Sequence, residues 1–232
     1  MIMNIQAPIY AVIVAGGQGV RMGTALPKQF LELAGRPVLS HTLQAFMDAL
    51  PGVRLILVLP PQQLSYAQMV LQQLPNRTDI TVVSGGATRF HSVQHGLDAV
   101  TEAGIVLVHD GVRPLVSREL IQRCCAQAQE KGSAIPAIPV TDSMRIVTGD
   151  RSEPVDRSAL RIIQTPQTFR TEILLPAYRQ PFRESFTDEA TVVEAYGGQV
   201  SLVEGERTNI KITTPEDLRI AEALLKARTE KA

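Results

Sequence analysis

A glycine-rich segment with two basic residues, running from Ala15 to Lys28, is the part of the sequence best suited to chemistry. It reads Ala-Gly-Gly-Gln-Gly-Val-Arg-Met-Gly-Thr-Ala-Leu-Pro-Lys and directly follows the apolar run 10–14. Glycines let backbone N–H groups close around an anion. Arg21 and Lys28 add positive charge that suits phosphate oxygens. We therefore expect this loop to bind phosphate groups.

The spacing of these glycines separates the loop from two common nucleotide-binding motifs. The dinucleotide fingerprint G-x-G-x-x-G fails because, starting from Gly17 and Gly19, its third glycine falls on Met22. A Walker-type loop fails because Lys28 lies between proline and glutamine, with no Ser or Thr after it. An ordinary turn between a strand and a helix would not explain three glycines within four residues, 16–19, combined with two cations.

A carboxylate follows the apolar run 105–108, in the segment His109-Asp110-Gly111-Val112-Arg113-Pro114. Magnesium in proteins takes one or two carboxylates together with substrate phosphates. Asp110 is therefore the predicted metal ligand, and the alternative is that it caps the next turn or pairs with Arg113. His109, at the end of a buried strand, is expected to pack and form hydrogen bonds rather than act in catalysis.

Two further segments carry polar groups that suit a ligand. Gly85-Gly86 precedes a predicted helix, and small residues there allow close backbone approach while Arg89 or Ser92 contacts polar edges. Lys211 lies just before the last helix, and together with Arg157 it would suit a second anionic group. The sequence shows no Ser-His-Asp order, cysteine nucleophile or His/Cys metal cluster.

Alternating strand-like and helix-like segments must position these loops. The predicted strands are 10–14, 54–59, 80–83, 105–109 and 134–140, and the predicted helices are 37–50, 64–74, 92–100 and 117–130. Strands that are apolar throughout and separated by helices predict an α/β fold, a mostly parallel sheet covered on both faces. Because ligands bind at the carboxyl ends of such strands, the glycine loop and the loops 84–92 and 109–114 should share one rim.

The pattern changes between residues 141 and 163. Two short strands, 144–147 and 154–160, indicate a hairpin arm inserted into a single domain that spans 1–232. A lone two-stranded hairpin is marginally stable in water, so the arm should pack on a second subunit or, alternatively, back on its own domain. The remaining predicted elements are helices 172–178 and 188–195, strands 199–204 and 210–212, and a last helix capped by Thr214.

Composition excludes several classes of protein. The 232 residues are 44% hydrophobic and 20% charged, which suits one large packed domain. A net charge of zero and the absence of Trp argue against a nucleic-acid-binding protein. Cys124 and Cys125 are expected to pack in a reducing compartment. The first apolar run is too short for a signal peptide or membrane span, so we expect a cytoplasmic protein.

A series of short motifs makes the sequence resemble one enzyme family. The motifs are Ala15-Gly16-Gly17-x-Gly19-x-Arg21-Met22, Pro27-Lys28-Gln29, Gly85-Gly86-x-x-Arg89-x-x-Ser92-Val93, His109-Asp110-x-x-Arg113-Pro114, Val155-Asp156-Arg157, Thr165-Pro166-Gln167, Thr187-Asp188-Glu189-Ala190 and Asn209-x-Lys211-x-Thr213-x-Pro215-Glu216-Asp217. In this order they resemble nucleotidyltransferases of the sugar-nucleotide type. Within these, they are similar to the 2-C-methyl-D-erythritol 4-phosphate cytidylyltransferase family of the non-mevalonate isoprenoid pathway.

The resemblance implies a Rossmann-like fold, a homodimer joined through the arm, and a reaction that uses Mg²⁺. CTP and 2-C-methyl-D-erythritol 4-phosphate would give CDP-linked methylerythritol and diphosphate, without a covalent enzyme intermediate. Catalysis would then consist of positioning and charge stabilisation.

The resemblance also implies a role for each matching residue. Those implied to bind the nucleotide are Ala15, Gly16, Gly17, Gly19, Gly86, Arg89, Ser92 and Asp110, with Gly86 and Ser92 at the cytosine and Asp110 holding the metal. Those implied to act in catalysis are Arg21, Lys28, Arg157 and Lys211. Those implied to bind the methylerythritol phosphate are Gly111, Arg113, Ser143, Arg157, Thr165, Thr187 and Lys211, some of them reached across the dimer.

Four positions depart from the family pattern without removing a proposed catalytic group. Val20 lowers the charge of the loop, and Ser143 replaces a threonine but keeps the hydroxyl; the other two are Ala87 and Thr208. One alternative is a cytidylyltransferase for another polyol phosphate, such as ribitol 5-phosphate, which the arm and Arg113 would distinguish. A non-catalytic nucleotide-binding module is the other alternative, and it would not need Arg21, Lys28 and Asp110 together.

Overall fold

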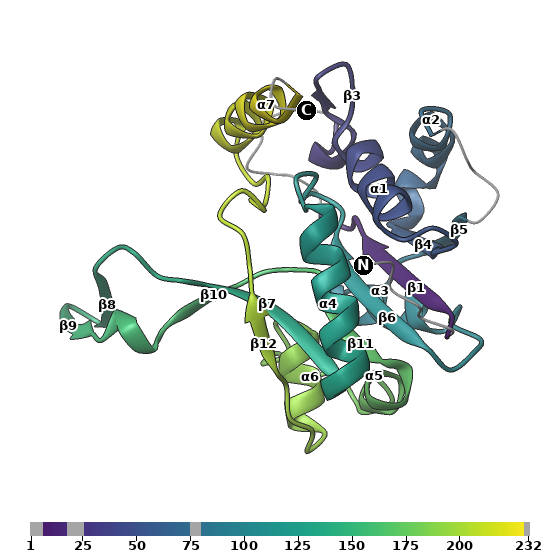
Figure 1. The fold of residues 1–232 in the computed structure, drawn as a ribbon. Coiled ribbons are helices and arrows are strands. Elements are labelled where there is room, and N and C mark those ends of the chain that lie inside the picture. The colour runs from purple at the N-terminus through teal and green to yellow at the C-terminus, as the bar shows by residue number, and fades with distance from the viewer. Residues whose placement is uncertain (1–6, 18–25, 75–79, 230–232) are drawn as a thin grey trace.

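The computed structural model describes residues 7–17, 26–74 and 80–229. Within these residues, eight strands form one twisted sheet with helices on both faces (Figure 1). The strand order is β10-β7-β11-β6-β1-β4-β5, and β12 pairs with β7. The predicted α/β class is confirmed.

The half of the sheet that carries the glycine loop is parallel. It consists of β1 (Ile9–Val14), β4 (Arg54–Leu59), β5 (Ile80–Ser84) and β6 (Ile105–Asp110), with β1 between β4 and β6. Every residue of β6 is buried. Side chains of alternate β1 residues pack in two different apolar clusters: Ala11 and Ile13 in one, and Val12 in the other. Both faces of the strand are therefore covered by helices.

Two sets of helices cover the two faces. One face carries α1 (Val38–Ala49), the 3₁₀ helix η3 (Pro61–Tyr66) with the short α2 (Ala67–Leu71), and α4 (Arg118–Lys131). The other face carries α3 (Arg89–Leu97), α5 (Thr171–Ala177) and α6 (Glu189–Ala195). The last helix, α7 (Pro215–Thr229), packs near the short strands β2 (Glu32–Leu33) and β3 (Arg36–Pro37) in a third apolar cluster. These layers bury the sheet and leave its strand ends free for loops.

The other half of the sheet is mixed. Strand β11 (Gln167–Arg170) is antiparallel to both of its neighbours, β6 and β7 (Ser133–Pro139). Strand β10 (Arg161–Ile163) pairs antiparallel with β7, while β12 (Leu202–Glu204) pairs parallel with it. The sequence did not predict β10 or β11, because both are short and neither is apolar throughout.

Several predicted elements outside the arm differ from the structure. The helix predicted over 64–74 is instead a 3₁₀ helix, η3, followed by a short α-helix, α2, which together span 61–71. The strand predicted over 199–204 is only Leu202–Glu204, and no strand forms over 210–212. Instead, the Ile212 backbone donates a single hydrogen bond to the Val112 carbonyl at 2.9 Å, and its side chain is buried beside α7. Helix α3 begins at Arg89, earlier than predicted, because the Thr88 hydroxyl accepts from the His91 backbone at its start.

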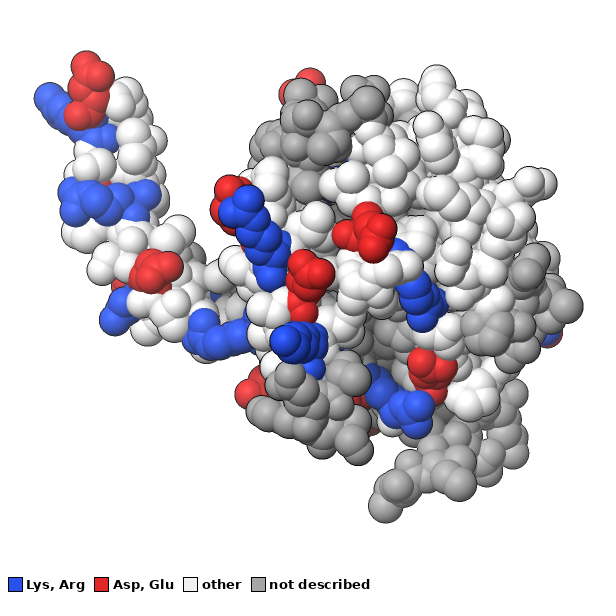
Figure 2. All heavy atoms as spheres, turned by 90° about the horizontal axis from the view of Figure 1, so that it is seen from above, with Lys and Arg blue, Asp and Glu red and all other residues white. Residues whose placement is uncertain are grey.

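The arm extends away from the body (Figures 1 and 2). Its strands β8 (Met144–Thr148) and β9 (Arg151–Val155) pair with each other and are exposed or half-buried along their length. The predicted second strand, 154–160, was wrong after Val155, because Asp156 caps a 3₁₀ turn, η4 (Arg157–Ala159), that leads into β10. The alternative in which the arm packs back on its own domain was also wrong.

The predicted helix caps and the packing of the two cysteines are confirmed. The Ser117 hydroxyl accepts from the Leu120 backbone at 3.0 Å, and the Thr214 hydroxyl accepts from the Asp217 backbone at 3.3 Å, so both residues cap their helices. Cys124 and Cys125 are buried and unbridged, and burial raises the pKa of the Cys124 thiol to about 12. Among the described residues, no helix combines the length and apolar character needed to cross a bilayer.

Candidate active site

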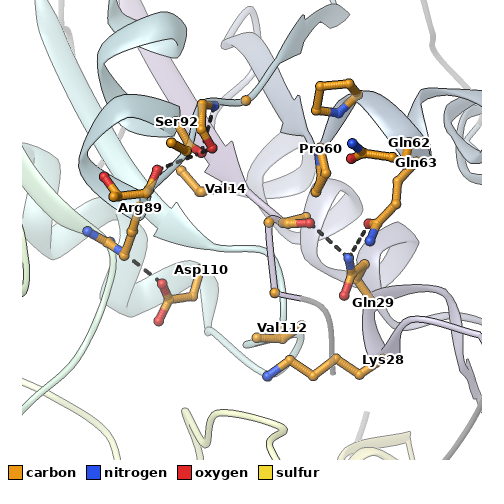
Figure 3. A pocket seen from close by; sticks show the side chains of 18 of the residues that line it. Val14, Lys28, Gln29, Pro60, Gln62, Gln63, Arg89, Ser92, Asp110 and Val112 are labelled. Carbon is orange, nitrogen blue, oxygen red and sulfur yellow. Dashed lines mark hydrogen bonds and ion pairs between the residues drawn. The ribbon is translucent and has the colours of Figure 1, made fainter. Parts of the chain in front are cut away.

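A cavity of about 740 Å³ opens at the carboxyl ends of the parallel strands. Three loops meet there: the glycine loop after β1, the loop after β5 and the turn after β6 (Figure 3). The expectation that these loops share one rim is confirmed. The predicted residues that line the cavity are Ala15, Gly16, Gly17, Lys28, Gly86, Arg89, Ser92, Asp110 and Lys211.

The described part of the glycine loop is anchored at its first residue. The Ala15 backbone N–H donates to the Val58 carbonyl at 3.0 Å, and the Ala15 carbonyl accepts from the Gln29 amide at 2.9 Å. The Lys28 side chain lies over Gly17, because a Cβ added at Gly17 would sit 3.4 Å from the Lys28 Cε. Lys28 is buried, and it brings its ammonium group to the cavity (Figure 3).

Two residues assigned to the loop, Gly19 and Arg21, lie outside the described residues. The departure at Val20 and the failed fingerprint position Met22 fall in the same segment. Their roles stay predictions from the motif.

The loop after β5 closes tightly on the start of α3. The Ser92 hydroxyl accepts from the Gly86 backbone at 3.1 Å and donates to the Thr88 carbonyl at 3.0 Å. A Cβ added at Gly86 would lie 2.5 Å from Cβ of His91 and 3.1 Å from its carbonyl carbon, so only glycine fits there without a backbone shift. The loop therefore presents its backbone to the cavity in one fixed arrangement.

Asp110, at the end of β6, is surrounded by positive charge. Its Oδ2 atom lies 3.0 Å from Nζ of Lys211 and 3.3 Å from Nε of Arg113, and its Oδ1 atom lies 3.6 Å from Nη2 of Arg89. Burial alone would raise the pKa of Asp110, but Arg89, Lys211 and Arg113 outweigh it and hold the pKa well below its usual range. Asp110 thus pairs with Arg113, as the alternative interpretation had it, and also faces the cavity.

Arg89 joins two carboxylates. Its guanidinium donates to both oxygens of Glu189, at 2.6 and 3.1 Å, and the Tyr178 hydroxyl donates to the same carboxylate at 3.2 Å. Burial opposes the charge of Arg89, but Glu189 and Asp110 raise its pKa above the usual value. Sequence reasoning did not identify Glu189, whose only signal was its place in the motif Thr187-Asp188-Glu189-Ala190.

His109 and Thr165 lie beneath Asp110 rather than in the cavity. The Thr165 hydroxyl accepts from the Asp110 backbone at 3.1 Å and pairs with Nδ1 of His109 at 3.0 Å. The other ring nitrogen of His109 donates to the Arg113 carbonyl at 3.2 Å, so the ring bridges the turn. Burial lowers the pKa of His109 to about 3. His109 is a neutral packing residue, as expected, and Thr165 fixes the end of β6.

The remaining predicted residues do not line this cavity. Gly111 packs under the rim, since a Cβ there would lie 3.0 Å from Cβ of Ala15, and the exposed Thr187 bonds through its backbone to Thr191. Ser143 and Arg157 lie on the arm, where Arg157 donates to the Thr141 carbonyl. The structure of one chain therefore separates Arg157 from Lys211.

One wall of the cavity was not predicted. Gln29 is fully buried, and its amide donates to Oε1 of Gln63 at 2.6 Å as well as to the glycine loop. Gln63 belongs to η3, which starts where Pro60-Pro61 ends β4. Figure 3 shows Gln29 and Gln63 side by side opposite Arg89 and Asp110. The only signal in the sequence was the position of Gln29 next to Lys28.

The arrangement favours the binding of phosphate groups. The described lining carries the cations Lys28, Arg89 and Lys211 and a single carboxylate, Asp110, beside glycine backbone. Among the described residues, no group of three His, Cys, Asp or Glu side chains could hold a metal by itself. A divalent cation at this rim would therefore need oxygens from a bound ligand.

Comparisons with known proteins agree with this chemistry. The sequence profile described as 2-C-methyl-D-erythritol 4-phosphate cytidylyltransferase matches residues 9–227. A protein of that name from Bacteroides thetaiotaomicron is 49% identical over 214 residues, which cover 92% of this chain and 98% of that protein. The crystal structure of the protein of that name from Thermus thermophilus is 38% identical with a TM-score of 0.74, covering 93% of this chain and 98% of that one. The structure of 4-diphosphocytidyl-2C-methyl-D-erythritol synthase from Anaerococcus prevotii is 30% identical with a TM-score of 0.80, covering 95% and 99%.

Proposed function

The chain belongs to the 2-C-methyl-D-erythritol 4-phosphate cytidylyltransferase family, and on this premise we propose how its residues carry out the reaction. The enzyme converts CTP and 2-C-methyl-D-erythritol 4-phosphate to 4-diphosphocytidyl-2-C-methyl-D-erythritol and diphosphate, a step of isoprenoid precursor biosynthesis. The observation that carries the residue assignments is that Lys28, Asp110 and the glycine loop line one cavity.

The nucleotide occupies the cavity between the glycine loop and α3. Gly16 and Gly17 present backbone to the triphosphate, and Lys28 lies over Gly17 where it can pair with phosphate oxygens. The cytosine lies at Gly86 and Ser92, whose hydrogen bond fixes the loop that meets its polar edge. A volume of about 740 Å³ is in the range of ordinary ligand pockets and suits a nucleoside triphosphate.

Asp110 is suited to hold Mg²⁺ together with the phosphates of CTP. Asp110 lines the cavity; its Oδ2 atom pairs with Lys211 and Arg113, while Oδ1 lies beyond hydrogen-bond distance from Arg89. One carboxylate oxygen plus phosphate oxygens and water matches the ligands that Mg²⁺ prefers. When bound, the metal would neutralise charge on the phosphates.

The reaction is a direct displacement at phosphorus. A phosphate oxygen of 2-C-methyl-D-erythritol 4-phosphate attacks the α-phosphorus of CTP, forming a new P–O bond as the bond to the β-phosphate oxygen breaks and diphosphate leaves. The protein supplies positioning and positive charge, from Lys28 on the nucleotide side and Lys211 on the acceptor side. Arg21 is assigned to the same charge stabilisation from its motif.

The acceptor site is completed by a second copy of the chain. The arm exposes Ile146 and Val147, which are 62% and 70% accessible, on a two-stranded hairpin that extends away from the body. Such a hairpin is marginal alone, which favours a homodimer in which Ser143 and Arg157 of the partner subunit reach the acceptor phosphate. We place the dimer in the cytoplasm, where the free thiols of Cys124 and Cys125 would stay reduced.

A labelling experiment tests this proposal. CTP labelled at the α-phosphate is incubated with 2-C-methyl-D-erythritol 4-phosphate, with Mg²⁺ or with a chelator, and the products are separated. We expect the label in the CDP-linked product, equal release of diphosphate, and no label on the protein. Label that stays on denatured protein would contradict direct displacement, and undiminished turnover in the chelator would contradict the role of Asp110.

A further inference from the structure

Glu189, in the first turn of α6, is a fully buried carboxylate with no role in the reaction described above. A buried charge is tolerated only where it is paired and hydrogen-bonded. The Arg89 guanidinium binds both of its oxygens, at 2.6 and 3.1 Å, and the Tyr178 hydroxyl adds a third bond at 3.2 Å. Through Arg89, this buried carboxylate is connected to the cavity.

The start of α6 holds Glu189 in place. The neighbouring Asp188 caps the helix by accepting from the Thr191 backbone at 2.9 Å. The Gln167 side chain donates to Asp188 at 2.9 Å and accepts from the Ala190 backbone at 2.8 Å. Gln167 begins β11, the strand that pairs with β6, and Asp110 ends β6. Both carboxylates are therefore fixed to adjacent strands of one sheet.

Arg89 lies between these two carboxylates but binds Glu189 more closely than Asp110. It makes two short bonds to Glu189, but its Nη2 atom remains 3.6 Å from Oδ1 of Asp110, which is longer than a hydrogen bond. Figure 3 shows Arg89 beside Asp110, on the same side of the cavity. A guanidinium that lost Glu189 would have Asp110 as its nearest carboxylate, and such pairs readily become bidentate. Oδ1 of Asp110, which now has only this long ion pair with Arg89, would then be covered.

We propose that Glu189 is a positioning residue that acts through Arg89: it occupies the guanidinium, so that Oδ1 of Asp110 stays open to the divalent cation bound with the nucleotide phosphates. The inference rests on the proposed function, since it takes Asp110 as the residue that meets this cation. It adds a reason for the Arg89–Glu189 pair.

Calorimetry of CTP binding in the absence of acceptor tests the proposal without using turnover. The affinity for CTP is measured with Mg²⁺ and with a chelator, and their ratio gives the enhancement by metal. We expect Glu189→Gln to reduce this enhancement about tenfold, the scale on which residues that orient metal ligands act. Glu194→Gln, an exposed glutamate of the same helix, is the matched control and should behave as the wild type does.

The double variant Arg89→Gln/Glu189→Gln identifies the route of the effect. Because it has no guanidinium to cover Asp110, it should regain most of the enhancement that Glu189→Gln alone loses. A double variant as impaired as the single one would contradict action through Arg89. If Glu189→Gln does not fold, as judged by circular dichroism, Glu189→Asp keeps the charge with a shorter reach, and it should show a smaller loss of the same kind.

The outcomes separate this inference from the proposed function. If Mg²⁺ enhances CTP affinity as much in Glu189→Gln and Glu189→Asp as in the wild type, the role of Glu189 is overturned. The proposal that Asp110 meets the metal then still stands. A wild type whose CTP affinity does not respond to Mg²⁺ overturns both.

Discussion

The Lys211 ammonium lies 3.0 Å from Oδ2 of Asp110, so a residue from the segment before α7 meets the end of a central strand. Two hydrogen bonds place this segment: the Ile212 backbone donates to the Val112 carbonyl, and the Arg113 guanidinium donates to the Asn209 carbonyl. The cation next to the proposed acceptor site is thus positioned by the turn after β6. Asp110 organises the charges of the cavity as well as facing it.

The first prediction concerns Asp110 and pH. Because neighbouring cations hold its folded-state pKa well below the usual value of about 3.9, the stability contributed by its ionised form is present above that value. It is lost as pH falls through the lower folded pKa. We expect the difference in unfolding free energy between the wild type and Asp110→Asn to be constant from about pH 8 to 5 and to shrink below about pH 4.

Urea unfolding at a series of pH values measures this difference. Asp98→Asn, a change at an exposed aspartate, is the matched control and should alter stability little. A difference that already disappears near neutral pH would show that Asp110 is not held ionised by its neighbours.

His109 predicts a second, distinct pH effect. Burial lowers its folded pKa to about 3, below the unfolded value of about 6.5. Between these values the unfolded chain binds a proton that the folded chain does not, so His109 reduces stability by up to about 1.4 kcal/mol for each unit that pH falls. NMR of the imidazole should show no titration between pH 8 and 5. A titration midpoint near neutrality would contradict the packing role.

Lys28 is predicted to stabilise charge in the transition state. Lys28→Ala should lower kcat by roughly 10²–10³, by analogy with the loss of one charge-stabilising donor, with a smaller change in the KM for CTP. Lys226→Ala, at an exposed lysine of α7, provides the control. Steady-state kinetics decides the matter, since an unchanged kcat would remove Lys28 from the mechanism.

Gly16 and Gly86, both on the rim of the cavity, are predicted to be needed for different reasons. A Cβ at Gly16 would make only an ordinary contact, 4.0 Å from the Ser92 hydroxyl, whereas at Gly86 it would clash with His91. Gly16→Ala should therefore keep the wild-type Tm and lose CTP affinity, while Gly86→Ala should lower both. Thermal unfolding and CTP calorimetry on the two variants check this contrast. Normal CTP binding by Gly16→Ala would contradict a nucleotide seated on the glycine backbone.

The dimer proposal predicts complementation between inactive variants. Arg157→Ala and Lys28→Ala affect different halves of a site that two subunits build together. The two variants are mixed after reversible dissociation, and one site of each heterodimer that forms is intact. The mixture should therefore regain up to about a quarter of the number of active sites in the wild type. No recovery in a mixture shown by mass to contain heterodimers would contradict the shared site.

The sequence predicted the parallel half of the fold well, for a physical reason. The run 54–59 is apolar after Arg54 and ends at Pro60-Pro61, and strand β4 has the predicted bounds. Strand β11, with the sequence Gln-Thr-Phe-Arg, carries no such signal, because its place between β6 and β7 depends on tertiary pairing. The alternating run 210–212 predicted a strand that does not form, because its apolar residues pack on α7 and have no partner strand.

Prediction of the site from the sequence was likewise limited to residues whose place follows from the parallel strands. Ser92, Asp110 and Lys28 were predictable because loops after parallel strands gather at one rim. Glu189 was not, because an acidic residue in the first turn of a helix is normally solvated and favours the helix dipole. Only the fold shows that this carboxylate is buried against Arg89.

The specificity of the enzyme for its acceptor is the central claim, and one ratio tests it. With CTP saturating and Mg²⁺ present, kcat/KM is measured for 2-C-methyl-D-erythritol 4-phosphate and for ribitol 5-phosphate. We expect a clear preference for 2-C-methyl-D-erythritol 4-phosphate. A higher kcat/KM for ribitol 5-phosphate would contradict it.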